Sequence, residues 1–439
     1  MQLLRKNNSH YIRTKKIFAI ILIIGILYLF FKDYESFNFM IVISFLTIIF
    51  IGFKEVFSLN NLPYGLSQIF YLFTLTFLGL APLYQYLQNI TLWGGSPFKD
   101  GDFLKVNILL IISLIIYQIS YSKTLKNKNK LKKIRIKPIS NSYLLITSII
   151  ATLYIFFIYG ANISALIFRS EYMNADVVSG GGLSYLVNTF FIRPIPAICF
   201  LLFKFYKKRN RLIEFVLLGL MLLTNAPTGM PRFAVAAFYI PMLFIYVPFI
   251  RQKLSFPFVI LFALLVIFPL LNLFRLSSEN INLKIDLSML LAGHFDSYQM
   301  MARVISEDFI TYGYQLLGVV FFFVPRFIWP TKPIGSGYLI AHEYDYYFDN
   351  LSMNYFGEGY INFGFIGMFA FAIIMGKING YFDRQYWINK RSSIPVFSLI
   401  YCISIGMEFA ILRGALLNIF PVFIGYTTSL LLIYKIVKK

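Results

Sequence analysis

Long apolar segments separated by short polar ones run along almost the whole chain. The segments are continuous rather than alternating, and a bilayer core takes about 20 apolar residues of helix. We expect helices because backbone groups in lipid must find their hydrogen bonds within the same segment. The twelve predicted spans are 17–31, 37–53, 62–87, 103–121, 140–160, 183–206, 212–225, 234–250, 256–274, 357–376, 394–411 and 414–434.

The first of these segments lies where a signal peptide would lie. No small-residue cleavage site follows it, and Phe30, Phe31 and Lys32 are typical of a span end, so we predict that it is retained. Hydrophobic residues make up 58% of the chain and charged residues 13%, whereas a soluble domain has about 25% charged residues. This composition excludes a soluble enzyme, a disordered chain and a collagen-like fibre. We predict an all-α polytopic membrane protein of about twelve spans, with residues 1–439 forming a single membrane domain.

The distribution of charge orients these spans. The formal net charge is +21, and 28 of the 40 Lys and Arg residues fall on the side that holds both termini, with only three of the 19 Asp and Glu residues. The positive-inside rule then places both termini in the cytoplasm. The positive charge is therefore a topology signal, and we expect membrane lipids but no nucleic acid as partners. The Lys-rich stretch 123–137 suits contact with anionic lipid heads, although orientation alone explains it.

The sequence offers little to a metal or a cofactor. Its two cysteines, Cys199 and Cys402, lie inside apolar segments, which excludes a disulfide framework and a Cys-based metal site. No cluster of His and carboxylate residues has the spacing of metal ligands. Neither a phosphate-binding Gly-Lys-Ser/Thr loop nor a dinucleotide fingerprint occurs. We therefore predict neither a metal nor a cofactor.

One loop, residues 275–356 between the ninth and tenth spans, is far longer than a usual connection. The predicted orientation makes it extracytoplasmic, and its first half predicts an amphipathic helix. The apolar face of that helix holds Leu291, Phe295, Tyr298, Ala302, Ile305 and Phe309, and the polar face holds Asp296, Gln299, Arg303 and Glu307. Two interpretations stay open: the helix lies on the membrane surface or on the other helices with its charges solvated, or Asp296 and Arg303 line a cleft for a polar substrate.

The second half of this loop is rich in turn-forming residues. The stretch VPRFIWPTKPIGSG (324–337) has three prolines that fix the backbone and glycines that permit close approach. Trp329 suits the membrane interface or the face of a sugar ring, and Arg326 and Lys332 supply positive charge. A rigid loop of this kind is suited to holding a phosphate head group.

Three runs carry a resemblance to a known family. They are FDSYQMMARVISEDFITYGYQLLGVVFFFVPRFIWPTKPIGSG (295–337), NYFGEGYINFGFIGMF (354–369) and ILRGALLNIF (411–420). Their order, an Asp-containing helix, a PR-x-x-WP-x-KP loop, E-x-x-x-N-x-G at a span start and a late RG pair, resembles the Wzy-type oligosaccharide repeat-unit polymerases of O-antigen, capsule and exopolysaccharide assembly. The first half of the chain resembles them in hydropathy alone.

This resemblance implies a multi-pass glycosyltransferase of the bacterial cytoplasmic (inner) membrane, inverting and independent of metal. Such enzymes transfer a growing glycan from undecaprenyl pyrophosphate to the next lipid-linked repeat unit. The implied partners are undecaprenyl-pyrophosphate-linked oligosaccharides, with a chain-length regulator and a flippase as protein partners.

A lipid pyrophosphate leaving group needs cations at the outer interface, and arginine binds its oxygens best. Six arginines lie at or near external span ends: Arg169, Arg193, Arg232, Arg275, Arg326 and Arg413. We predict that Arg232, Arg326 and Arg413 bind the pyrophosphate, with Lys332 as a helper. The alternative for each is an arginine that reaches for a lipid head group. Several arginines on the side that should lack positive charge favour an anion site.

The acceptor hydroxyl needs a base, and three residues are candidates: His294, Asp296 and Glu358. Glu358 also suits a helix cap, because an acid is favourable at a helix N-terminus, and Asn362 lies one turn further on the same face. We predict that Arg303, Trp329 and Asn362 contact the sugars, and that the intramembrane Glu408 pairs with Arg413. The sequence does not indicate which of these three residues is the base.

Two other functions remain. A lipid-linked oligosaccharide flippase or another transporter should show internal repeats, broken spans and polar groups near the bilayer midplane, whereas here the ionisable groups are predicted at one face. An O-antigen ligase would share the topology, the large external loop and the donor, and would differ in its acceptor.

Overall fold

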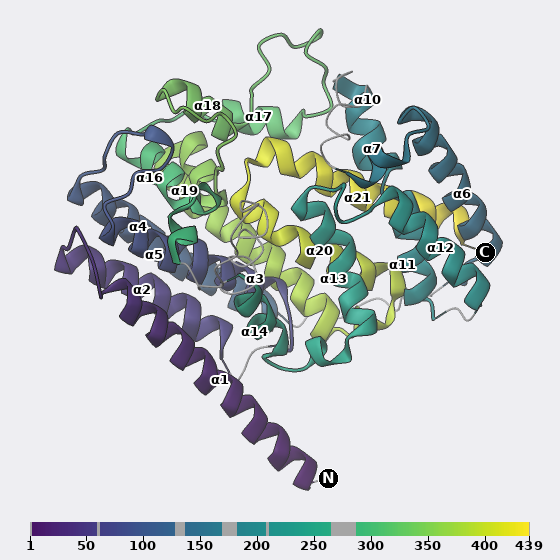
Figure 1. Ribbon diagram of the computed structural model, residues 1–439, viewed down its shortest axis with the longest axis horizontal. Helices are drawn as coiled ribbons and strands as arrows, with labels where there is room; N and C mark the ends of the chain where they lie inside the picture. Colours follow the sequence, from purple (N-terminus) through teal and green to yellow (C-terminus); the bar gives the residue numbers. More distant parts are fainter. Residues whose placement is uncertain are drawn as a thin grey trace, which may run out of the picture.

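The structure is a computed structural model that describes residues 2–58, 62–127, 137–168, 182–207, 210–264 and 287–438 (Figure 1). Within these ranges the regular structure is helical, and one isolated antiparallel bridge pairs Ile139 with Lys438. Eight helical segments are long and apolar enough to cross a membrane. They are Phe39–Val56 (α2), Leu66–Leu87 (α3 and α4), Asp100–Lys126 (α5), Asn141–Ile158 (α6), Gly182–Phe205 (α10 and α11), Tyr355–Ile388 (α19 and the turn after it), Pro395–Arg413 (α20) and Leu416–Val437 (α21).

The eight segments coincide with eight of the twelve predicted spans, which confirms a polytopic helical membrane protein. The other four predicted spans meet α1 (Gln2–Phe30), α12 (Arg211–Thr224), α13 (Arg232–Tyr246) and α14 (Ser255–Phe262). Of these, α12 and α13 have 14 and 15 residues. Residues 265–274 of the ninth predicted span lie outside the described residues. The number of twelve spans and the orientation therefore stay predictions.

Two apolar cores hold the helices together. One gathers α2, α3, α5, α16 (Ser297–Ser306) and α19, and the other gathers α6, α11, α12, α13, α20 and α21. Small residues let α19 approach α5 closely: a Cβ at Gly376 would lie 2.7 Å from the Tyr117 carbonyl oxygen, and one at Gly380 would lie 2.8 Å from that of Tyr121. Such close backbone contact is typical of membrane helices, whose association depends on packing rather than on the hydrophobic effect.

Hydrogen bonds join helix ends that the predicted spans place on the same side. Ser140 N–H, before α6, donates to the Val437 carbonyl at the end of α21 at 2.8 Å, and both lie on the predicted cytoplasmic side. Asn38 Nδ2, before α2, donates to Asp100 Oδ2 at the start of α5 at 2.9 Å, and both lie on the opposite side. Two helix ends on the same side of a membrane must be separated by an even number of spans. Both contacts agree with this requirement.

The tenth predicted span, 357–376, differs from a straight helix. Phe363 (φ −147°, ψ 26°) and Gly364 (φ 62°, ψ −150°) break α19 (Tyr355–Asp383) into segments 355–362 and 365–383. The segments meet at two glycines, since a Cβ at Gly359 would lie 2.8 Å from the carbonyl oxygen of Gly367. All eight residues of the first segment are buried. Glu358 and Asn362 therefore lie on a short buried helix before the break.

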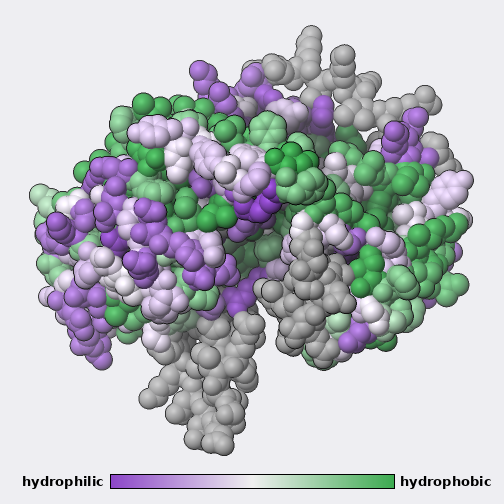
Figure 2. Space-filling view, turned by 90° about the horizontal axis from the view of Figure 1, so that it is seen from above, coloured by the Kyte–Doolittle hydropathy of each residue, from purple (hydrophilic) through white to green (hydrophobic). Residues whose placement is uncertain are grey.

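The long loop also differs from the prediction of one helix over 291–309. Two 3-10 turns, Leu287–Leu291 and Gly293–Phe295, precede α16, and α17 (Tyr314–Val320) and α18 (Ser336–Glu343) follow it. Both faces of α16 are buried, including Asp296 at its N-terminus and Arg303. The helix does lie on other helices, α5 and α19 among them, but the expectation that Asp296 and Arg303 are solvated is wrong. The loop helices cover one side of the molecule, and polar residues gather there over α16 and α18 (Figures 1 and 2). Residues 275–286 lie outside the described residues.

Candidate functional site

Four side chains from distant parts of the chain form what we term the Asp296 cluster: Trp93, Asp296, Ser352 and Arg413. Asp296 is 1% exposed. Its Oδ1 accepts from Ser352 Oγ at 2.5 Å and from Arg413 Nη2 at 3.3 Å. Its Oδ2 accepts from Ser352 N–H at 3.1 Å and from Trp93 Nε1 at 3.3 Å. Four donors thus satisfy one buried carboxylate, which is how a charge is kept inside a protein.

Local backbone structure delivers each member of the cluster. Trp93 has left-handed dihedrals (φ 58°, ψ 23°) within the turn Leu92–Gly94, which turns its indole toward the loop. Gly293 lies against that indole so closely that a Cβ would fall 1.7 Å from the ring. Asn354 caps α19 by accepting from Gly357 N–H at 2.8 Å and donates to the Ser297 carbonyl at 2.7 Å, which fixes Ser352 two residues earlier.

Arg413 ends α20 and, like Trp93, is only partly buried. Its side chain is 37% exposed, and its Nε has no hydrogen-bond partner among the residues that the structure describes. The predicted pairing of Arg413 with Glu408 is wrong. Glu408 Oε1 instead accepts from Asn379 Nδ2 at 2.7 Å, because Asn379 of α19 reaches it across the helix interface while Arg413 turns toward Asp296.

Glu358 and Asn362 fix the surroundings of the cluster rather than line an open surface. Glu358 is wholly buried, and its Oε1 accepts from Leu416 N–H at 2.9 Å. It therefore caps α21, whereas Asn354 caps Glu358's own helix. Asn362 Oδ1 accepts from Leu316 N–H at 2.8 Å and thereby holds α17. The link between α20 and α21 is consequently fixed at Arg413 by Asp296 and at Leu416 by Glu358.

Arg303 belongs to a separate buried group. Its Nε donates to Tyr346 Oη at 3.0 Å and its Nη1 to Glu307 Oε1 at 3.1 Å, its Nη2 donates to the Ser96 carbonyl, and its guanidinium lies over the Phe98 ring at 4.4 Å. The side chain is only 4% exposed. Arg303 thus joins the α16 helix to the segment before α5, and the predicted sugar contact would need these bonds to open.

The cationic side chains of the turn-rich loop bind carbonyl groups of the same loop. Arg326 donates to the carbonyls of Lys332 at 2.7 Å and Pro333 at 3.1 Å. Lys332 Nζ donates to the carbonyls of Phe322 at 2.6 Å and Val324 at 3.0 Å, and burial, followed by the charge of Arg326, lowers the pKa of Lys332. Trp329 is half-buried and donates to Thr331 Oγ1 at 3.1 Å. Arg326 and Lys332, which the sequence predicts to bind phosphate, thus hold the loop in a fixed shape.

Two further predicted residues lie apart from these groups. His294 is half-buried in the turn Gly293–Phe295, two residues before Asp296. Arg232 is exposed at the first residue of α13. Of the other arginines, Arg193 is 3% exposed and donates to the carbonyls of Thr224 at 2.9 Å and Leu166 at 3.5 Å, while Arg169 and Arg275 lie outside the described residues.

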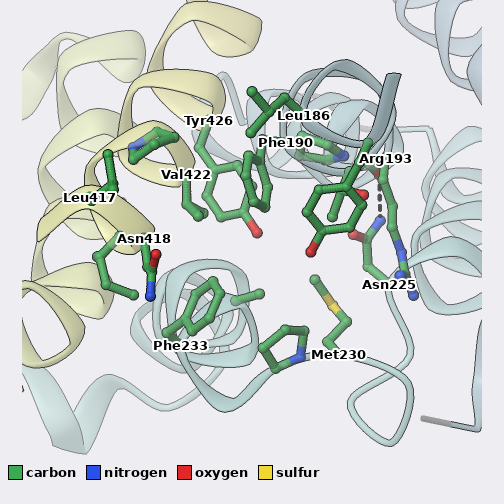
Figure 3. Close-up of a pocket in the computed structure, with 17 residues that line it drawn as sticks. Leu186, Phe190, Arg193, Asn225, Met230, Phe233, Leu417, Asn418, Val422 and Tyr426 are labelled. Atoms are coloured by element: carbon green, nitrogen blue, oxygen red, sulfur yellow. Dashed lines mark hydrogen bonds between the residues drawn. The ribbon is translucent and has the colours of Figure 1, made fainter. Parts of the chain in front are cut away.

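A cavity of about 390 Å³ opens beside α13 and α21 (Figure 3). Its lining includes Phe233 of α13, Asn418 and Tyr426 of α21, Arg193 of the turn before α11, and Asn225 of the turn before α13. None of these five residues is among the predicted site residues, although Arg193 is one of the six external arginines. The turn that contains Asn225, Pro227 and Gly229 can be recognised in the sequence. The sequence does not indicate which residues lie beside that turn.

Searches against protein-family models, curated proteins and solved structures returned no match. The function is therefore argued from the residues and their geometry.

Proposed function

We propose that this protein is a membrane glycosyltransferase that polymerises oligosaccharide repeat units carried on undecaprenyl pyrophosphate. The growing glycan would be transferred from its lipid pyrophosphate to the next lipid-linked unit at the outer face of the cytoplasmic membrane. The observation that carries the proposal is the contact of Asp296 with Arg413. It joins two of the three runs that resemble the polymerase family, across 117 positions of sequence, and Glu358 of the third run holds the same link at Leu416.

The Arg413 guanidinium has the properties of an anion-binding group. Asp296 holds it from one side, and more than a third of the side chain is exposed, while its Nε is a buried atom without a partner among the described residues. A preorganised guanidinium of this kind can receive charge that develops on a departing pyrophosphate. In this proposal Arg413 is the principal pyrophosphate ligand, Asp296 positions it, Arg232 is a second cation, and Arg326 with Lys332 fixes the covering loop.

The geometry also separates the three candidate bases. Asp296 is buried and already accepts four hydrogen bonds. Glu358 is wholly buried and caps α21. His294 is half-buried two residues before Asp296 along the chain, so it is the most accessible of the three candidates. We assign His294 as the general base, since a base must come within hydrogen-bond distance of the proton it takes.

A lipid-linked oligosaccharide transporter is the second candidate, and two observations favour it. The break at Phe363 and Gly364 makes α19 a discontinuous helix, and Glu408 with Asn379 forms a buried polar pair between α19 and α20. Broken helices and interior polar groups are features of transporters. The break here, however, lies under α17 and positions Asn362 to hold that helix, which gives it a structural role in the covering loop.

The decisive test is reconstitution of the purified protein in vesicles with lipid-linked repeat units. Longer lipid-linked glycans support the polymerase, movement across the bilayer without a new bond supports the transporter, and transfer to lipid A core alone supports the ligase. In the polymerase case, Arg413→Ala should slow chain lengthening by roughly 100-fold or more, the usual loss when one transition-state donor is removed. Arg413→Lys should recover part of the rate, because the charge is kept and the bidentate geometry is lost.

The matched control is Arg211→Ala. Arg211 is an exposed arginine at the first residue of α12, on the predicted cytoplasmic side. Loss of an exposed charge there should leave chain lengthening unchanged. An Arg413→Ala protein that inserts normally and makes full-length polymer would remove Arg413 from the site.

A further inference from the structure

The cavity beside α13 contains buried polar groups without partners. Asn225 is wholly buried, and its Oδ1 has no hydrogen-bond partner among the described residues. Its Nδ2 donates to the Arg193 carbonyl at 3.0 Å and to Thr224 Oγ1 at 2.8 Å, so the amide cannot simply turn over. Thr189 is 9% exposed, and its hydroxyl likewise has no described partner. Orphan buried polar atoms are rare in folded proteins, and each calls for an explanation.

The chemistry of these atoms limits what can fill the cavity. A carbonyl oxygen such as Asn225 Oδ1 accepts hydrogen bonds and donates none, so its ligand must bring an O–H or N–H group. A pyrophosphate brings mainly acceptors, and an isoprenoid chain brings neither donor nor acceptor. The Arg193 guanidinium is engaged by the Thr224 and Leu166 carbonyls, and among the described lining residues no Asp or Glu is present to attract a cation.

The remaining walls are aromatic and aliphatic. Phe190 and Tyr426 are 8% and 3% exposed, and Phe233 lies on the floor formed by the start of α13. Figure 3 shows Asn225 and Asn418 at opposite ends of the cavity, with Tyr426 between them. Flat aromatic surfaces combined with a few fixed amide and hydroxyl groups suit a ligand whose rings are apolar on their faces and hydroxylated at their edges. The volume lies within the range of about 300–1,000 Å³ that small-molecule sites occupy.

We propose that this cavity is a binding site for a neutral saccharide, whose hydroxyl groups donate to Asn225 Oδ1 and bond to Thr189 Oγ1. As a place for the glycan it rests on the proposed polymerase function, but the binding itself requires no turnover. Asn418 lies in the first turn of α21, five residues after Arg413, so one short segment connects the cavity to the Asp296 cluster. The site would hold sugar units of the glycan while the pyrophosphate lies at Arg413.

The test uses full-length protein in lipid nanodiscs and an immobilised array of neutral hexose, N-acetylhexosamine and deoxyhexose oligosaccharides. The key variant is Thr189→Val, which keeps the side-chain shape and removes the hydroxyl. Since that hydroxyl has no partner in the described protein, folding should be unaffected, while saccharide affinity should fall roughly tenfold, which corresponds to the loss of one good hydrogen bond. Phe233→Leu, which removes a ring and keeps an apolar side chain, should weaken binding of the same saccharides.

Ser148→Ala is the matched control. Ser148 in α6 is also buried with an unpartnered hydroxyl, but it does not line the cavity, so its loss should leave affinity unchanged. Inorganic pyrophosphate and farnesol serve as the competing ligand classes. The proposal is overturned if the wild type binds no neutral saccharide, if Thr189→Val binds them as well as the wild type, or if only pyrophosphate or farnesol binding depends on Thr189.

Failure of the cavity assignment and failure of the proposed function give different results. Saccharide binding that depends on Thr189 in a protein that lengthens no chain would remove the polymerase and keep the cavity. Chain lengthening with binding that is insensitive to Thr189 would keep the polymerase and remove the cavity.

Discussion

The Asp296 cluster and the cavity beside α13 contain similar polar groups but use them in opposite ways. In the cluster, one buried carboxylate is surrounded by donors from three segments, and each of its oxygens accepts two hydrogen bonds. In the residues that line the cavity, a buried amide oxygen and a buried hydroxyl have no described partner. Both regions adjoin the link between α20 and α21. The difference separates a carboxylate that holds the fold from cavity groups that, in our proposal, bond to a ligand.

The physical reason for this separation is the free energy of a buried polar atom. A buried group that is bonded contributes modestly to stability, whereas an unbonded one costs about 1–3 kcal/mol. Removing a member of the Asp296 cluster should therefore destabilise the fold, and removing an orphan group from the cavity should not. Substitutions made in both regions test this difference in stability.

Asp296→Ala should have the largest effect on stability. The change leaves Arg413 without its counter-charge and removes the acceptor of Ser352 and Trp93, so the free energy of unfolding should fall by about 3 kcal/mol. Thermal unfolding of the purified protein in detergent measures this loss. An Asp296→Ala protein as stable as the wild type would show that the cluster does not hold the loop, and the contrast with the cavity would vanish.

Gly293→Ala should have the next largest effect. A Cβ there would lie 1.7 Å from the Trp93 indole, so the ring must move away from Asp296, and overpacking of this kind costs about 1–3 kcal/mol. Gly101 in the first turn of α5 is the matched control, since a Cβ there meets nothing within 4 Å. Gly101→Ala should leave unfolding unchanged or raise its midpoint. Equal behaviour of the two variants would contradict a fixed Trp93.

The smallest and most direct comparison removes one hydroxyl from each region. Ser352→Ala deletes a donor to Asp296 and should lower the free energy of unfolding by about 1 kcal/mol. Thr189→Val deletes a hydroxyl that has no described partner and should leave it unchanged or slightly raise it. Denaturation midpoints of the two variants measured side by side decide the matter, and a larger loss for Thr189→Val would reverse our assignment of the two regions.

Much of the fold could be predicted from the sequence, because long apolar segments have few ways to satisfy their backbone in lipid. The eight segments long enough to span lie where hydropathy places them. The break in α19 could not be predicted, since it depends on Gly359 meeting Gly367 and on a loop that covers Asn362. The burial of the charged residues of α16 could not be predicted, because the spacing of Asp296 and Arg303 indicates a polar face but not whether protein or water lies against it.

Candidate residues could be named from the sequence, but their partners could not. Asp296, Glu358 and Arg413 lie in separate runs, and only the packing of α16, α19 and α20 brings Asp296 to Arg413 and Glu358 to Leu416. The same packing directs Arg413 toward Asp296 rather than Glu408. Arg326 instead binds carbonyl groups of its own loop. Trp93 and Ser352 carried no sequence signal, because an indole N–H or a hydroxyl becomes functional only through what it faces.

The amino-acid sequence by itself determined that this chain forms apolar helices that can cross a membrane, since that outcome depends on local composition and on the hydrogen-bonding needs of the backbone. Which buried polar atoms are paired and which lack a partner depends on the tertiary structure alone. Hydrogen bonds act over about 3 Å, so this outcome depends on contacts between residues far apart in the sequence.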